Sequence, residues 1–243
     1  MRTISFDIKK NDELDRLCRV SNNLYNQALY QCKESYKKDS KYLNYNDLDK
    51  LMKTLPNLDG EINYRLLPVH CSQHILKLLD KNYKSFFNST KDYKLNPNKY
   101  KNAPHPPEFR KKGGKFILIF TNQQTKIKDG YIQFKKGFYI RIPQYEKYKN
   151  EIDNFQQIRV LPLINGEYKI CIIYKNALKT PLTEYGNIAS IDIGIDNMVT
   201  MISNVDRPLI VNGKNLKSKS KYYFDKIAFY QSELKKNKKK INK

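Results

Sequence analysis

The spacing of hydrophobic and polar residues divides the N-terminal part of the chain into one strand and several helices. Apolar side chains alternate with polar ones over residues 4–8, which predicts a strand. From Asn11 to Cys32 they recur every three or four residues, which predicts a helix with one apolar stripe. Similar stripes predict a short helix capped by Asn46 and a longer helix that follows Pro68. We therefore expect one strand followed by a helical bundle.

A second region, after residue 114, has the pattern of a β-domain. The polar, basic and proline-rich stretch at 91–114 is interpreted as a linker or a loop that crosses between subdomains. Beyond it, turn signals separate short β-patterned segments, and Asn165-Gly166 is the strongest hairpin signal among them. We expect a small β-barrel or curled sheet that also takes up the strand at 4–8, with the helical bundle inserted into it. The expected strands cover 116–120, 125–128, 131–134, 138–142, 157–163 and 167–174.

A third region follows a short connector at 179–185, and it contains an acidic residue within an apolar pattern. Asp192 lies in the sequence Ile-Ala-Ser-Ile-Asp-Ile, where burial of an ionised carboxylate is costly unless a cation or hydrogen bonds compensate. One interpretation is a site for a divalent cation. The alternative is a structural Asp at a strand end that is hydrogen-bonded to the neighbouring turn. The elements expected here are strands at 188–193, 197–203 and 208–212 and a helix from about Lys214.

The charge of the chain points to a polyanionic partner. The 46 Lys and Arg residues outnumber 24 acidic residues and give a net charge of +22. Such a field attracts nucleic acid first and an anionic membrane surface second. No apolar run approaches the ~18 residues that span a bilayer, and no signal-peptide core is evident, so we expect a cytoplasmic bacterial protein. The cysteines are expected to be buried thiols in a reducing compartment, without a zinc site: Cys18, Cys32, Cys71 and Cys171.

Clusters of lysine and arginine are the candidate contacts to phosphate groups. Aromatic residues lie between the lysines of the C-terminal helix, which favours phosphate contact with occasional base stacking. The alternative is a solvated helix face or a frayed terminus. His70 and His74 have a helical spacing that can bind Zn²⁺, but no third ligand accompanies them. The candidate nucleic-acid contacts are Arg110, Lys111, Lys112, Lys217, Lys219, Lys221, Lys235 and Lys236.

The motif Asp192-x-Gly194-x-x-Asn197 resembles the first RuvC motif of TnpB/OrfB proteins, which bacterial insertion sequences encode and which are related to type V CRISPR effectors. The resemblance rests on the order and spacing of several segments along the whole chain. It implies an RNA-guided DNA endonuclease with a RuvC, ribonuclease-H-like fold, in which Asp192 is the first catalytic carboxylate and a Mg²⁺ ligand. It also implies guide-like RNA and target DNA as partners. The similar segments are 23–29, 69–87, 107–112, 129–143 and 188–202.

The resemblance implies a mixed α+β chain with an incomplete nuclease domain. Residues 1–9 plus 95–184 correspond to a wedge-like β-barrel, 10–94 to a helical recognition-like insertion and 185–243 to a partial RuvC domain. The family's strand-borne Glu, its zinc ribbon of paired Cys-x-x-Cys motifs and its third Asp motif have no counterpart in the sequence. Asp196 does not replace them, because four residues along a strand span ~13 Å and Gly194 would place Asp196 at a turn tip.

A truncated TnpB/OrfB-like protein without nuclease activity is therefore the expectation from the sequence. Asp192 without its partners would bind Mg²⁺ weakly and could not form a two-metal clamp. This leaves room for a separate chain that completes the RuvC domain. The alternative is an unrelated basic RNA-binding protein in which Asp192 is structural. Binding of a guide-like RNA from the element's own end would favour the first hypothesis, and indifferent binding of any structured RNA would favour the second.

Overall fold

The computed structural model describes residues 1–175 and 186–241, with side chains described up to residue 234. The chain divides into two compact units, Met1–Lys179 and Thr180–Lys243, which are treated separately below. Both contain antiparallel sheets and helices, so the expected mixed α+β class is confirmed at this level. None of the helices in the described ranges is both long and apolar enough to cross a membrane.

The helices of the first unit are α1 (Asp12–Asp39), α2 (Tyr45–Met52), α3 (Val69–Leu95) and the short 3₁₀ helix η1 (Pro97–Lys99). Helix α1 begins at Asn11, whose side chain accepts a hydrogen bond from the Leu14 N–H over 3.0 Å. The predicted apolar stripe of α1 is buried along its length, which confirms the helical spacing found in the sequence.

The boundaries of the other two helices differ from the prediction. Helix α2 is capped by Asn44 and not by Asn46, because Asn44 forms a reciprocal capping box with Asp47. Helix α3 starts after Pro68 as expected, but it extends to Leu95, so the first residues of the predicted linker are helical.

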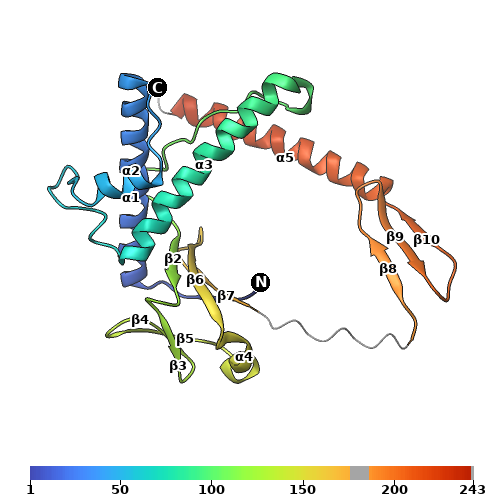
Figure 1. Ribbon diagram of the computed structural model, residues 1–243. Coiled ribbons are helices and arrows are strands. Elements are labelled where there is room, and N and C mark those ends of the chain that lie inside the picture. The colour runs from blue at the N-terminus through green and yellow to red at the C-terminus, as the bar shows by residue number, and fades with distance from the viewer. Residues whose placement is uncertain (176–185, 242–243) are drawn as a thin grey trace. The chain divides into compact units, whose positions relative to one another are not determined.

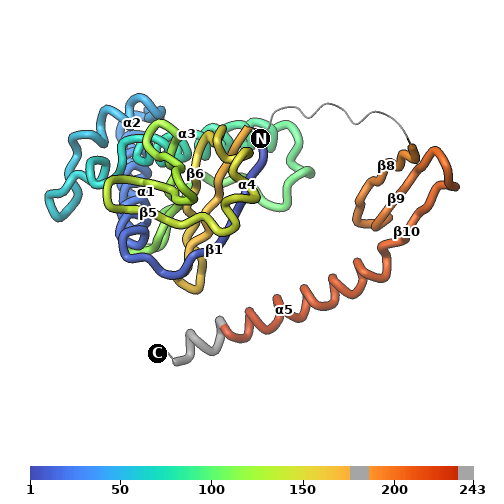
Figure 2. Tube along the Cα trace, turned by 90° about the horizontal axis from the view of Figure 1, so that it is seen from below, coloured from blue at the N-terminus to red at the C-terminus, as the bar shows by residue number. Residues whose placement is uncertain are grey.

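A four-stranded antiparallel sheet lies beside this bundle, in the order β1-β7-β6-β2. Strand β1 pairs with β7 from Arg2 opposite Tyr174 to Ile8 opposite Tyr168. The N-terminal strand is therefore part of this sheet, as predicted. Strands β6 and β7 are joined by the predicted turn at Asn165-Gly166. The chain trace in Figure 2 labels β1 and β6 of this sheet. The bounds are β1 (Arg2–Ile8), β2 (Leu118–Thr121), β6 (Phe155–Pro162) and β7 (Tyr168–Tyr174).

A second sheet in this unit has the order β3-β4-β5, with β3 at Lys126–Lys128, β4 at Tyr131–Lys135 and β5 at Phe138–Arg141. Asp129 and Gly130 join β3 to β4 with φ values of 50° and 78°, the left-handed geometry of a tight hairpin turn. Over the described residues the strands form two separate sheets, so closure into one barrel is not confirmed. Helix α4 (Tyr145–Ile152), which was not predicted, follows β5.

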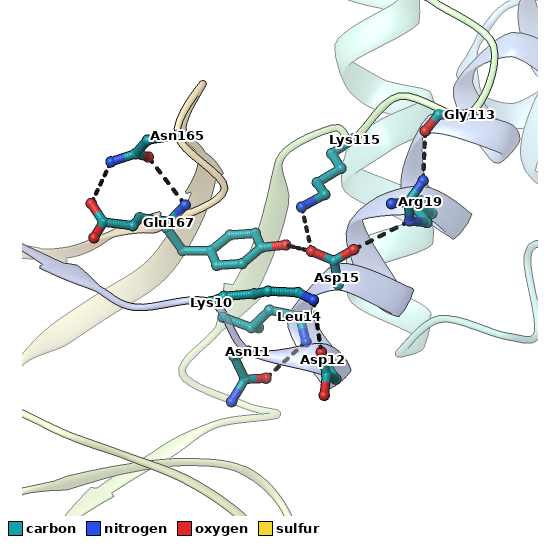
Figure 3. A network of polar contacts seen from close by, with 11 residues as sticks. Lys10, Asn11, Asp12, Leu14, Asp15, Arg19, Gly113, Lys115, Asn165 and Glu167 are labelled. Carbon is teal, nitrogen blue, oxygen red and sulfur yellow. Dashed lines mark hydrogen bonds and ion pairs between the residues drawn. The ribbon is translucent and has the colours of Figure 1, made fainter.

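The helices and the two sheets share one hydrophobic core. Helix α3 packs against α1 and β2 (Figure 1), and Phe120 of β2 meets Phe134 of β4 edge-on with ring centroids 4.6 Å apart. Asp15 of α1 accepts hydrogen bonds from Lys115 and, over 2.6 Å, from the Tyr168 hydroxyl of β7 (Figure 3). The bundle is thereby attached to the four-stranded sheet through both apolar and polar contacts.

The second unit contains a three-stranded antiparallel sheet, in the order β10-β9-β8, followed by a long helix. All of the strands predicted here are present, and the helix starts where expected. The predicted connector at 179–185, with its Pro181, lies outside the described residues. The bounds are β8 (Ala189–Asp192), β9 (Asn197–Ser203), β10 (Leu209–Asn212) and α5 (Lys214–Ile241).

Candidate functional site

Asp192 is the last residue of β8, and it lies opposite Thr200 of β9. Its side chain is exposed to solvent. Burial of this carboxylate within the strand is not found, and its position matches the alternative of an Asp at a strand end, because β8 ends at this residue and is an edge strand of its sheet. An exposed carboxylate pays little for desolvation, so Asp192 does not need a bound cation in order to be tolerated.

The turn after Asp192 depends on two glycines. The Gly194 N–H donates to the Asn197 carbonyl over 3.1 Å, and a Cβ at Gly194 would come within 2.8 Å of that same oxygen. The Gly213 N–H donates to the Asp196 carbonyl over 2.9 Å, and a Cβ at Gly213 would lie 2.7 Å from the Ile195 carbonyl. Glycine is required at both positions, since any side chain would collide with backbone oxygens. The turn is thus held closely against the start of α5.

The second carboxylate of this turn is already paired. Asp196 lies between β8 and β9, and its carboxylate accepts a hydrogen bond from the Lys217 Nζ over 2.5 Å. As the sequence suggested, Asp196 belongs to the turn and not to a strand beside Asp192. Lys217, which is one of the candidate nucleic-acid contacts, is therefore already engaged in an ion pair within its own unit.

A two-metal site does not fit the described residues. Nowhere in the described ranges do three or more His, Cys, Asp or Glu side chains come close enough to hold one metal ion. His70 contacts the Thr121 hydroxyl through Nδ1 over 2.5 Å, which gives that ring a structural partner. Mg²⁺ prefers several oxygen ligands, and two-metal catalysis needs carboxylates that bridge or flank both ions. A single carboxylate, that of Asp192, does not meet that requirement within the described residues.

The remaining lysine candidates of the second unit lie on α5. Lys219 and Lys221 are exposed in its first two turns, as a phosphate contact would require. Lys235 and Lys236 fall where only the helical backbone is described, so the positions of their side chains lie outside the described structure. The aromatic residues between the lysines are exposed as well, and the Lys226 Nζ lies 4.8 Å from the Tyr222 ring centroid.

The basic cluster of the first unit consists of Arg110, Lys111 and Lys112, and its members differ in their contacts. The Arg110 guanidinium lies 3.9 Å from the Phe116 ring centroid. The backbone N–H of Arg110 donates to the side-chain oxygen of Asn26 over 2.8 Å. Burial lowers the pKa of Arg110. Lys111 and Lys112 are exposed in the loop that follows. Arg110 therefore fixes this loop on α1 and the core, while the two lysines are available to a polyanion.

One basic surface was not singled out from the sequence. One face of the β3-β4-β5 sheet carries lysine, arginine and tyrosine side chains, whereas apolar side chains lie on the opposite face. The signal was the alternation within 126–128, 131–135 and 138–141, in which every second residue is lysine, arginine, tyrosine or glutamine. Recognition of one common face requires the strand register, which the sequence alone does not give.

Comparison with known proteins locates a family signature in the C-terminal part. Residues 169–243 match the OrfB_IS605 family, described as a probable transposase. Solved structures of a CRISPR-Cas12f ternary complex and of a Cas12f1-sgRNA-target DNA complex are similar at a TM-score of 0.37 and 11% identity each. The alignments cover 91% and 96% of this chain but only 52% and 62% of those chains. No curated protein matches the chain.

Proposed function

Over residues 169–243 this chain is related to the OrfB_IS605 transposase family, and from this relationship we propose that it is a nucleic-acid-binding, transposon-encoded protein of the TnpB/OrfB type. The matching segment includes all of β7 except Tyr168, the whole β8-β9-β10 sheet and α5. It therefore contains Asp192 and the glycine-dependent turn. This family match is the observation that carries the proposal.

The charge supports nucleic acid as the partner. A net charge of +22 raises the local concentration of a polyanion and speeds its association. Exposed lysines occur in both units, at Lys111 and Lys112 and on α5. Phosphate contacts of this kind bind nucleic acid without reading its sequence. We propose guide-like RNA and target DNA as the specific partners.

The architecture fits the domain organisation expected of such a protein. Strand β1 pairs with β7 although the bundle helices α1, α2 and α3 are among the elements that lie between them in the sequence, which supports a helical insertion into a sheet domain. We propose that the two sheets of the first unit form the wedge-like domain. The β8-β9-β10 meander followed by α5 supports the beginning of a ribonuclease-H-like domain.

The chain as it stands is proposed to lack nuclease activity. In complete family members, Mg²⁺ ions are expected to orient water and to stabilise the oxygens of a phosphodiester displacement. The described residues do not supply the carboxylates for such a site. A separate chain that brings the missing acidic residues would restore it, and this is the additional partner that we propose.

Comparison of two RNAs tests the proposed function. The full chain is mixed with a labelled RNA transcribed from the DNA that flanks its gene and, separately, with an unrelated structured RNA of equal length and folding energy. We expect the flanking RNA to bind at least ten-fold more tightly at 150 mM salt. Equal affinity for both would contradict a guide-like partner and would favour a general RNA-binding protein.

A further inference from the structure

The β3-β4-β5 sheet has two chemically different faces. The register pairs Lys126 with Gln133 and Gln133 with Tyr139, so these three side chains point to the same face. A second row on that face joins Lys128, Tyr131 and Arg141. We call this face, with its six residues Lys126, Lys128, Tyr131, Gln133, Tyr139 and Arg141, the outer face.

The opposite face anchors the sheet in the core. Ile132 and Ile140 are fully or almost fully buried, and Phe134 stacks on Phe138 with ring centroids 5.2 Å apart. Phe134 also contacts Phe120 of the neighbouring sheet. Since every second residue is fixed in this way, the backbone under the outer face is held in place. The outer side chains are thus presented on a rigid support and not on a loop.

Two tyrosines on the outer face remain exposed. Tyr131 is 44% exposed and Tyr139 is 52% exposed. They are diagonal neighbours on paired strands, which places them about 7–8 Å apart. The amide of Gln133, which is on the same strand as Tyr131, donates to the Tyr139 hydroxyl over 3.4 Å. A surface hollow of about 610 Å³ runs over this part of the sheet, lined by Lys128, Asp129, Tyr131, Gln133 and Tyr139.

The charge around these rings is strongly positive. Residues 126–141 contain five basic side chains and a single acidic one, Asp129 in the turn. Lys126, Lys128 and Arg141 belong to the outer face itself, and all three are exposed. Exposed aromatic rings within a field of cations are the combination by which proteins hold single-stranded nucleic acid, through base stacking and phosphate contact.

We propose that the outer face binds unpaired nucleotides, with two bases stacked on Tyr131 and Tyr139 and the flanking phosphates held by Lys126, Lys128 and Arg141. The Gln133 amide is placed to meet the edge of a stacked base. This inference rests on the proposed nucleic-acid-binding function and specifies one site for it. A duplex fits less well, because its bases are stacked on each other and do not offer their faces to a ring.

Fluorescence anisotropy with the full chain tests the site. The probes are a labelled 12-nucleotide oligouridylate, the corresponding oligothymidylate and a labelled duplex of 12 base pairs, all at one salt concentration. Each of Tyr131→Ala and Tyr139→Ala should weaken single-strand binding by roughly 5–150-fold and leave duplex binding unchanged. The variants Tyr131→Phe and Tyr139→Phe should bind as the wild type does, because the ring is retained. Comparison of the two single strands shows whether the natural ligand is RNA or DNA.

A matched control is provided by Tyr30, which is 51% exposed and belongs to α1 and not to this sheet. Tyr30→Ala should leave single-strand affinity within two-fold of the wild type, and thermal unfolding should show that all variants are folded. Unchanged affinity in the double variant Tyr131→Ala/Tyr139→Ala would overturn the proposed site but not the proposed function. Equal loss for single strands and duplex would also overturn it. No binding of any probe by the wild type would instead contradict the proposed function.

Discussion

Asp15 illustrates how single charged residues join the helices of the first unit to its sheet. Burial would raise the pKa of Asp15, but hydrogen bonds from Lys115 and Tyr168 and the contact with Arg19 outweigh it and lower the pKa to about 2. The Tyr168 side chain is itself fully buried. This contact links residues 153 positions apart, so it belongs to the tertiary structure and not to α1 alone.

Replacement of Asp15 by Asn should therefore destabilise the first unit. We expect the free energy of unfolding at pH 7 to fall by roughly 1.5–3 kcal/mol, the usual contribution of hydrogen bonds to a charged group. The carboxyl has a lower pKa in the folded state than its ordinary value of 3.8. Its contribution is thus complete above pH 4 and is lost as the pH falls towards 2.

Chemical denaturation of the wild type and of Asp15→Asn at several pH values measures this contribution. The difference between them should be largest near neutral pH and should shrink below pH 4. Asp12→Asn is the control, because the Asp12 side chain is almost fully exposed and its ion pair with Lys10 is long, at 3.6 Å. It should change the free energy of unfolding by less than about 0.5 kcal/mol. A pH-independent difference for Asp15→Asn would contradict the ionic origin of the effect.

Asp192 is the residue on which the sequence and the structure differ most. The apolar pattern around it correctly predicted its strand, and the alternative interpretation placed Asp192 at a strand end, but the pattern did not predict that its side chain is exposed. Alternation of apolar and polar residues indicates which side chains are buried only where one face of the sheet packs on a core and the other faces solvent. Strand β8 is an edge strand, and all of its residues are exposed. Burial of one carboxylate could therefore not be inferred from its apolar neighbours.

The absence of carboxylate partners in the described structure leads to a prediction on cleavage. Purified full chain with Mg²⁺ or Mn²⁺ should leave single-stranded and duplex DNA intact, with or without the flanking RNA. Asp192→Asn should show the same result. Product formation by the wild type that is lost in Asp192→Asn would show that the site is complete, and gel analysis of labelled substrate measures this directly.

At the scale of elements, hydrophobic periodicity predicted most of the helices and strands. Long segments with a consistent stripe, such as α1 and β7, were placed correctly because their buried residues repeat many times. Helix α4 was missed, since its eight residues are mostly charged or aromatic and bury only Ile152. The Asn44 cap was missed because Asn44 and Asn46 are each followed three residues later by an aspartate, Asp47 and Asp49, and only the structure shows that the capping box forms between Asn44 and Asp47.

The two units are expected to differ in their resistance to local opening. Strands β6 and β7 are the middle strands of their sheet, and their inward side chains are buried. The strands of the second unit bury little, and apolar side chains remain exposed on it, including Ile191, Ile193, Ile202 and Ile210. Amide protection rises with buried contact, so residues 186–241 should exchange faster than β6 and β7.

Hydrogen exchange followed by mass spectrometry checks this difference. Peptides from 155–174 should remain protected at times when peptides from 189–212 have exchanged almost completely. Addition of a chain that completes the RuvC domain should slow exchange in the second segment only. Equal protection of both segments in the isolated chain would contradict an uncovered second unit.

At the scale of the whole molecule, the sequence predicts the net charge but not where the charged side chains lie. The excess of basic residues follows from composition alone. The structure was needed to show that Lys217 forms an ion pair with Asp196 and that Arg110 packs on the Phe116 ring. It was also needed to show that Lys126, Tyr139 and Arg141 gather on one face, because strand register determines this.

Salt dependence of binding tests the central claim, that this chain binds nucleic acid through its positive charge. Titration of the full chain into labelled structured RNA between 50 and 200 mM salt should lower the affinity on the order of 10³-fold, if about six phosphates are neutralised. The variant Lys219→Gln/Lys221→Gln should flatten the slope by about one unit for each lysine that contacts a phosphate. No binding at 50 mM salt, or an affinity that does not change between 50 and 200 mM, would contradict the claim.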